Sequence, residues 1–261
     1  YIDLAIASPN VPGLQLFKGT GSGTFTSTPY ATYGTTGLNS VVTGNFDEAG
    51  GVDLAVSDGN GKVYFYFNNG DGTFGADGDP SCSVDILSLP TRMAAGDFNH
   101  DGATDVAVIY DDYFNGDSVY ILINDGDGDF TGSDSFPPAP ATYWLSKDLT
   151  VGDADGDGNA DIFVTYLSQE VPTEPGRVSV FRGNGEGTFN TLTNLVTGEG
   201  PVGIAVEDFN GDGNDDVAVA NRYSNKVSVL CGNGLGGFAP KQDFSVGSRP
   251  LYITAGDFNN D

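Results

Sequence analysis

The sequence has few basic residues and a large excess of acidic ones. Its 261 residues include only 10 Lys and Arg against 36 Asp and Glu, which gives a formal net charge of −26 at pH 7. Nucleic-acid binding depends on Lys and Arg that neutralise phosphates, and anionic membrane surfaces attract basic segments. No apolar run approaches the roughly 18 residues of a membrane-spanning helix. We therefore expect neither nucleic-acid binding nor membrane insertion.

Histidine and cysteine are nearly absent. His100 is the single histidine, so a catalytic histidine pair is excluded, and we expect this residue to face solvent. Cys82 and Cys231 lie in different parts of the repeat described below and are expected to be unpaired thiols. The chain contains no phosphate-binding Gly-Lys loop and no nucleophile elbow. A binding protein is therefore favoured over an enzyme.

Aspartate and glycine are abundant, and they concentrate in short loops. In residues 153–161, carboxylates occupy positions 1, 3, 5 and 9 and a glycine occupies position 6, directly before the apolar run 162–164. Ca²⁺ takes six to eight oxygen ligands, and alternate residues of a tight loop can direct their oxygens to one centre. Carboxylates about 4 Å apart repel one another by roughly 4 kcal/mol near a protein surface, and a divalent cation reverses that sign. The loop is therefore predicted to bind calcium.

The loop recurs along the chain. Copies begin at residues 45, 97, 153, 208 and 257, so successive copies are 52, 56, 55 and 49 residues apart. Such a period, made of strand-like segments, is typical of a propeller or another repeat array. Asp125, Asp127 and Asp129 imitate the loop but lie at a hairpin turn of the repeat, where a solvated turn is favoured over a metal site.

Three of the loops, 97–105, 153–161 and 208–216, carry the full pattern. The loop 45–53 is weaker because Ala49 replaces the third ligand, and the loop that starts at Asp257 needs Asp3 to complete it. Position 7 would bind through its backbone carbonyl. The predicted ligands, for about three to five calcium ions, are Asn45, Asp47, Asp53, Asp97, Asn99, Asp101, Ala103, Asp105, Asp153, Asp155, Asp157, Asn159, Asp161, Asp208, Asn210, Asp212, Asn214, Asp216, Asp257, Asn259, Asp261 and Asp3.

Each repeat is predicted to form four strands. The first leads into the loop, as in 40–44 or 251–256, and the fourth is variable. The second strands, apolar on both faces, are 4–7, 54–56, 106–109, 162–164 and 217–220. The third strands, each ending in a glycine-rich turn, are 14–17, 63–67, 119–123, 178–181 and 227–230. Phenylalanines in the loops (Phe46, Phe98, Phe209, Phe258) and after the turns (Phe25, Phe74, Phe130, Phe189, Phe238) are expected to form core between the sheets.

Four antiparallel strands in about 52 residues form the blade of a β-propeller. We predict an all-β chain with a single propeller domain over residues 1–261. The favoured arrangement has five blades, closed by pairing of the C-terminal strand with the N-terminal blade, because a closed ring leaves no exposed sheet edge. The alternative is that the chain is part of a seven-bladed propeller.

The repeated pattern resembles a known family. Gly-Asp-Phe-Asn-x-Asp-Gly-x-x-Asp followed by Val-Ala-Val, then Gly-Asn-Gly-x-Gly-x-Phe, is similar to the FG-GAP repeat of integrin α chains, also called the VCBS repeat. The resemblance covers the whole chain. It implies a calcium-loaded propeller that carries its metal loops on one face and ligand-binding loops on the other.

The face opposite the loops is the candidate binding surface, since exposed aromatic residues beside arginine are typical of recognition sites. The candidate residues there are Arg92, Tyr113, Tyr143, Trp144, Tyr166 and Arg249. We expect a non-catalytic, calcium-binding recognition or adhesion module that binds an extracellular protein or glycan. Millimolar extracellular calcium suits such loops and favours a secreted or cell-surface location. The alternatives are a lectin, a polysaccharide lyase-like enzyme that would use residues such as Tyr143 and Lys147, and a surface-assembly subunit.

Overall fold

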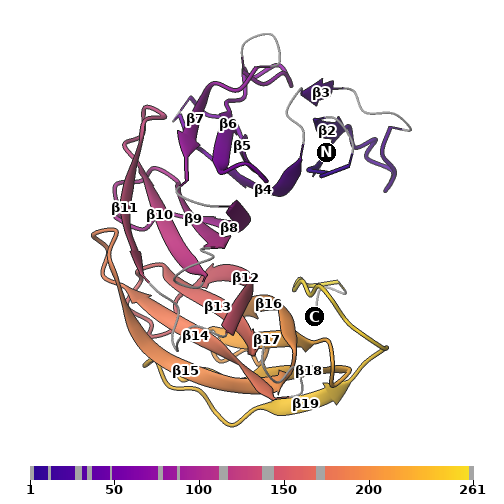
Figure 1. Ribbon diagram of the computed structural model, residues 1–261, viewed down its shortest axis with the longest axis vertical. Coiled ribbons are helices and arrows are strands. Elements are labelled where there is room, and N and C mark those ends of the chain that lie inside the picture. Colours follow the sequence, from indigo (N-terminus) through magenta and orange to yellow (C-terminus); the bar gives the residue numbers. More distant parts are fainter. Residues whose placement is uncertain are drawn as a thin grey trace. The chain divides into compact units, whose positions relative to one another are not determined.

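The computed structural model describes residues 3–10, 13–26, 31–33, 37–47, 49–75, 79–86, 89–111, 117–136, 144–168 and 174–258 (Figure 1). These residues form β-strands joined by turns, and they contain no α-helix. Within the same ranges, no helix has the length and apolarity that crossing a membrane requires. The prediction of an all-β chain is confirmed.

The strands form five successive antiparallel sheets. The first has the order β1 (Leu4–Ile6), β2 (Leu14–Phe17), β3 (Ala31–Tyr33). The second is β4 (Leu38–Gly44), β5 (Asp53–Asp58), β6 (Lys62–Tyr66), β7 (Cys82–Asp85). The third is β8 (Leu89–Gly96), β9 (Asp105–Asp111), β10 (Ser118–Asn124), β11 (Phe130–Phe136). The fourth is β12 (Trp144–Gly152), β13 (Asp161–Ser168), β14 (Pro175–Gly183), β15 (Phe189–Glu199). The fifth is β16 (Pro201–Glu207), β17 (Asp216–Asn221), β18 (Lys226–Leu230), β19 (Gln242–Ser245).

The chain packs as two compact units. One consists of Tyr1–Asp97, Asp101–Asp111 and Ile121–Gly132, and the other of Phe98–His100, Asp112–Tyr120 and Ser133–Asp261. The first unit holds the first two sheets and most of the third. The second unit holds the fourth and fifth sheets and the rest of the third.

The second strand of a sheet is its most buried element. Every residue of β5 and β17 is buried, as are seven of the eight residues of β13. This confirms the prediction of strands that are apolar on both faces. The exception is β1, the corresponding strand of the first sheet, where Leu4 is 40% and Ile6 is 36% exposed. Among the described residues of its own unit, β1 pairs with β2 alone and is therefore an edge strand.

Neighbouring sheets of a unit pack through their first strands and through phenylalanines. Strand β4 lies beside β8 in one unit, and β12 lies beside β16 in the other. Phe46, fully buried, meets Phe65 edge-on, and Phe65 stacks on Phe130 of the next sheet at a centroid distance of 3.8 Å. In the second unit, Phe98 packs edge-on against Phe189 at 5.4 Å.

Three of the predicted core phenylalanines are exposed. Phe25 is 46%, Phe209 is 42% and Phe258 is 86% exposed, so the expectation is wrong for them in this structure. Phe25 lies between β2 and β3 of the first sheet, Phe209 lies in the loop between β16 and β17, and Phe258 lies in the segment after the fifth sheet. Within its own unit, no further complete sheet packs against any of the three among the described residues.

The segment 251–256 does not form the predicted strand, although its backbone lies along β16. A Cβ placed on Gly203 of β16 would lie 3.0 Å from the Leu251 carbonyl oxygen and 3.0 Å from Tyr252 Cα. The segment thus lies beside a first strand, as β16 lies beside β12. It has no hydrogen-bonded partner strand among the described residues of its unit, and pairing of that kind is what defines a strand.

Candidate metal centre

The loop 153–161, between β12 and β13, gathers carboxylates around one point. One carboxylate oxygen from each of Asp153, Asp155 and Asp161 lies within 4.8 Å of the others. The Asp155 side chain is only 10% exposed, and its Oδ1 atom is buried without a hydrogen-bond partner. A buried carboxylate oxygen without a donor is costly unless a cation completes it. The donor set consists of hard oxygen atoms, which suits Ca²⁺ or Mg²⁺.

The backbone of this loop is wound around Asp153. The Asp153 carboxylate accepts hydrogen bonds from the N–H groups of Gly156, Asp157 and Gly158 at 2.8, 3.2 and 3.0 Å. The two glycines have positive φ angles of 70° and 84°. This left-handed conformation is accessible to glycine at little cost, which explains their place in the pattern. Asp153 is therefore held in place before any ion arrives.

The ninth-position aspartate has a second role that the sequence analysis missed. Asp161 is fully buried, and its Oδ2 and Oδ1 accept hydrogen bonds from Ala154 N and Gly183 N, both at 2.8 Å. It therefore fastens the loop to the end of the third strand of the same sheet. The corresponding bonds to the third-strand end are Asn68 N to Asp53 Oδ1 at 2.7 Å, and Asn124 N to Asp105 Oδ1, Gly232 N to Asp216 Oδ1 and Gly19 N to Asp3 Oδ1, each at 2.8 Å. The signal was present in the sequence, because aspartate stands at position 9 even in the weakened copy 45–53.

Burial makes two of these carboxylates resist ionisation. The pKa of Asp161 is raised to about 6, first by burial and further by Asp155 and Asp153, against the lowering effect of its two backbone donors. Burial, followed by the charge of Asp157, also raises the pKa of Asp155. The pKa of Asp208, in the loop 208–216, is instead lowered, chiefly by the Gly213 N–H. A divalent cation bound in the loop 153–161 would reverse this resistance, since it favours the ionised form.

The loop 208–216 repeats the same backbone arrangement. The Asp208 carboxylate accepts hydrogen bonds from Gly211, Asp212 and Gly213 N–H at 2.7, 3.1 and 2.8 Å. The Asn210 side chain donates to Asp216 Oδ2 at 3.1 Å, which brings positions 3 and 9 together. Among the described residues, the group formed by Asp153, Asp155 and Asp161 is the one whose acidic ligand atoms already converge.

In the loop 97–105, Asp97 occupies the equivalent place. Its Oδ2 accepts the Gly102 N–H at 3.1 Å, and its Oδ1 is buried without a hydrogen-bond partner, as in Asp155. The side chain of Asp101 accepts the Ala103 N–H at 2.8 Å. His100 is exposed, as expected, and its Nε2 lies 3.1 Å from the Gly158 carbonyl oxygen.

The two weaker copies are less complete. In 45–53, the Asp47 carboxylate accepts the N–H of Ala49 at 2.9 Å, which closes the turn where a ligand is missing. In the copy that begins at Asp257, Asn259 and Asp261 lie outside the described residues. Asp125 Oδ1 accepts the N–H groups of Asp127 and Asp129, as expected of a hairpin turn.

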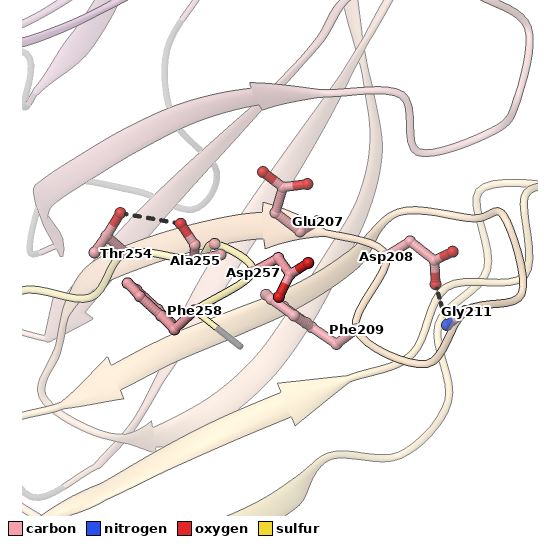
Figure 2. A pocket seen from close by; sticks show the side chains of 9 residues that line it. Glu207, Asp208, Phe209, Gly211, Thr254, Ala255, Asp257 and Phe258 are labelled. Carbon is pink, nitrogen blue, oxygen red and sulfur yellow. Dashed lines mark hydrogen bonds between the residues drawn. The ribbon is translucent and has the colours of Figure 1, made fainter. Parts of the chain in front are cut away.

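Asp257 lines a pocket of about 840 Å³ between the end of β16 and the segment 254–258 (Figure 2). Figure 2 shows the Asp208 carboxylate bonded to the Gly211 N–H, and the exposed rings of Phe209 and Phe258 lining the pocket. The lining is thus mixed, with apolar rings between acidic side chains.

The structure describes four of the six residues of the predicted binding surface. Tyr113 and Tyr143 lie outside the described residues. Tyr166 is fully buried, so the expectation of an exposed aromatic there is wrong; β13 is covered on both faces, and burial raises the pKa of this phenol. Arg249 has a positive φ of 56°, and its N–H donates to Asn225 Oδ1 in a turn. Arg92, on β8, donates from its guanidinium to the Thr91 carbonyl oxygen at 2.8 Å.

Trp144 has a partner that the sequence analysis did not identify. The guanidinium carbon of Arg177 lies over the indole ring, 5.3 Å from its centroid, in cation–π contact. Arg177 pairs with Tyr166 across β13 and β14, and Trp144 begins β12, so the register brings the two together at one end of the fourth sheet.

Successive antiparallel sheets, repeated about every 50 residues with their first strands side by side, define a β-propeller, and the five sheets agree with five blades. The chain belongs to the FG-GAP-like repeat family, whose sequence model matches residues 45–108, 97–164, 171–219 and 208–261. The sequence matches none of the curated proteins with which it was compared.

Solved structures share the fold at low identity. The periplasmic gluconolactonase PpgL of Pseudomonas aeruginosa is 18% identical with a TM-score of 0.68, over 95% of this chain and 68% of that one. BBS1N, in complex with ARL6DN, is 17% identical with a TM-score of 0.57, over 82% of this chain. The WD40 domain of Toxoplasma gondii coronin is 12% identical with a TM-score of 0.60, over 93% of this chain. The chain spans 58% of the BBS1N chain and 55% of the coronin domain. At such identities the likeness concerns the fold alone.

Proposed function

We propose that the protein is a calcium-binding, non-catalytic recognition module, in which the ions stabilise the loops between first and second strands. The observation that carries this proposal is the loop 153–161, where three carboxylates converge and Asp155 Oδ1 is buried without a donor. Asp153, Asp155 and Asp161 would hold the ion, with Asp157 and the Asn159 carbonyl as further ligands. The equivalent residues of 97–105 and 208–216 would hold two more ions.

The role of the ion is structural. It would neutralise carboxylates whose ionisation burial opposes and would fix the loop against the second strand. A site filled at a hundred times its dissociation constant adds about 2.7 kcal/mol to the free energy of unfolding. Three such sites would add roughly 8 kcal/mol, which for a chain of this length raises the melting temperature by about 15 °C or more.

The module would act outside the cytoplasm, where calcium reaches the millimolar concentrations that such loops need. The surface around Trp144 and Arg177 offers an aromatic ring and a cation together, which suits a protein or glycan partner. A glycan array and a pull-down with the Trp144→Ala variant as control test this part of the proposal.

Calcium titration tests the metal proposal. We expect calorimetry to show binding of about three ions, and EDTA to lower the melting temperature. Asp155→Asn should abolish one site. Asp127→Asn, which lies in an acidic hairpin turn outside the proposed calcium loops, should leave the number of bound calcium ions unchanged. A chain that binds no calcium at millimolar concentration, with a melting temperature that EDTA does not change, would refute the proposal.

A further inference from the structure

The loop 153–161 carries a basic side chain that the calcium pattern does not include. Arg182, on β14, directs its guanidinium at the loop: Nε lies 2.5 Å from Asp155 Oδ2, and Nη2 lies 2.6 Å from Asp157 Oδ2. Two proposed metal ligands, at positions 3 and 5, are thus held by one planar fork. Each contact is a charge-assisted hydrogen bond, which is stronger than a bond between neutral groups.

The strand register explains how Arg182 reaches the loop. Ile162 pairs with Phe181, so Arg182 lies opposite Asp161, the ninth-position aspartate. The next residue, Gly183, donates its N–H to that aspartate at 2.8 Å. Any side chain at position 182 therefore lies beside the metal loop of its own sheet, although about 25 residues separate the two in sequence.

The same register position can be read in every sheet, because the following N–H always bonds to the ninth-position aspartate. The residues at this position, in sheet order, are Lys18, Phe67, Ile123, Arg182 and Cys231. The loop 208–216 thus has a cysteine where the fourth sheet has a guanidinium, and it has Asn210 at position 3 where the loop 153–161 has Asp155. Each loop therefore serves as the internal control for a substitution made beside the other.

We propose that Arg182 is an internal counter-ion of the loop 153–161, whose guanidinium pairs with the third and fifth ligands and competes there with a divalent cation. This inference rests on the calcium binding proposed above and adds that Arg182 lowers the calcium affinity of its own loop. In the empty state the guanidinium reduces the repulsion among the carboxylates. In the loaded state its charge opposes that of the ion at close range, weakened by the solvent that reaches this half-exposed side chain.

Two opposite effects of one substitution follow. Arg182→Gln should tighten calcium binding at 153–161 by on the order of tenfold, because the competing charge is gone. The same variant should lower the melting temperature in EDTA, because the empty loop loses its counter-ion. Arg182→Lys keeps the charge but loses the fork, and its calcium affinity should stay close to that of the parent. A residue that only helped the fold would lower stability with and without calcium.

The experiment must measure calcium binding at each loop separately. Two-dimensional NMR of the full chain during a calcium titration does so, because the amide signals of Gly156 and Gly158 report on the loop 153–161 and those of Gly211 and Gly213 report on the loop 208–216. In Arg182→Gln the Gly156 pair should move to lower concentration and the Gly211 pair should stay unchanged.

The converse substitution guards against a misfolded variant. Cys231→Arg places a guanidinium beside the loop 208–216 and should weaken calcium binding there by a similar factor, leaving 153–161 unaffected. If the Gly156 pair responds at the same or higher calcium concentration in Arg182→Gln, the counter-ion proposal is wrong while the calcium proposal stands. If neither pair of amides in the parent responds to calcium, the calcium proposal itself fails.

Discussion

Replacing Asn124 by alanine should destabilise the protein by about 3 kcal/mol. Asn124 ends β10, is fully buried, and ties three backbone groups together. Its Nδ2 donates to the carbonyl oxygens of Phe46 at 2.9 Å and Thr104 at 3.1 Å, and its Oδ1 accepts the Gly126 N–H at 3.1 Å. Since Phe46 belongs to the loop of the preceding sheet, this one amide joins two neighbouring sheets.

The magnitude follows from the three hydrogen bonds. Each contributes about 1 kcal/mol net, and a backbone group left buried without a partner costs about 1–3 kcal/mol. Asn68 is the matched control, because it stands at the same register position in the preceding sheet. Asn68 is only partly buried, and its Nδ2 donates within its own sheet, to the Val52 carbonyl oxygen at 3.2 Å. Its Oδ1 accepts the Gly70 N–H at 2.9 Å at an exposed site. Water can replace both bonds, so Asn68→Ala should cost about 1 kcal/mol or less.

Urea denaturation at fixed calcium, monitored by circular dichroism, measures both variants against the parent. The expected result is a difference of about 2 kcal/mol between them, with unchanged denaturant dependence. Equal costs for Asn124→Ala and Asn68→Ala would show that the bond between the sheets contributes nothing, and the reasoning would then be wrong.

Three further outcomes are expected. The pKa of Asp161 is raised from 3.8 to about 6 by burial, so the folded, metal-free protein holds this proton more tightly than the unfolded chain. In EDTA, the stability that this group contributes is therefore present below pH 4 and is lost as the pH rises through 6, which denaturation would measure. The apparent calcium affinity of its loop should fall as the pH drops below about 6, which calorimetry would measure. Gly183→Ala should cost about 3 kcal/mol, since its Cβ would lie within van der Waals overlap of the Ala160 carbonyl oxygen, whereas Gly213→Ala, in open space at φ +86°, should cost about 1 kcal/mol in the same denaturation assay. Burial raises the pKa of Cys82 to about 11, so iodoacetamide at pH 8 should alkylate it at least about a hundredfold more slowly than a free thiol, as mass spectrometry would show.

The repeat, the loops and the buried second strands could be predicted from the sequence because each depends on residues close together in the chain. Apolar runs such as 162–164 follow the acidic loop directly, and their burial needs no knowledge of distant partners. Cys82 and Cys231 are unpaired, as predicted from their different positions within the repeat. The family pattern, spread over most of the chain, made the propeller fold predictable as well.

Features that depend on strand pairing could not be read from the sequence. Arg182 reaches the loop only because β13 and β14 pair in one register, and the contact between Arg177 and Trp144 has the same origin. Tyr166 was expected to be exposed on the face opposite the loops, yet the packing on both sides of β13 buries it. Sequence patterns also gave no sign that Phe25 and Phe209 are exposed, since that depends on which sheets pack beside them.

The ninth-position aspartate begins the second strand of its sheet and also closes the loop before it. The residues proposed to hold an ion in the loop 153–161 therefore lie in the same contiguous stretch of about fifty residues as the strands of their blade. A tandem duplication of such a stretch in the gene would copy a blade already equipped with its own site. Propellers of this kind can thus gain or lose blades in whole steps during evolution without having to build each new ion site from nothing.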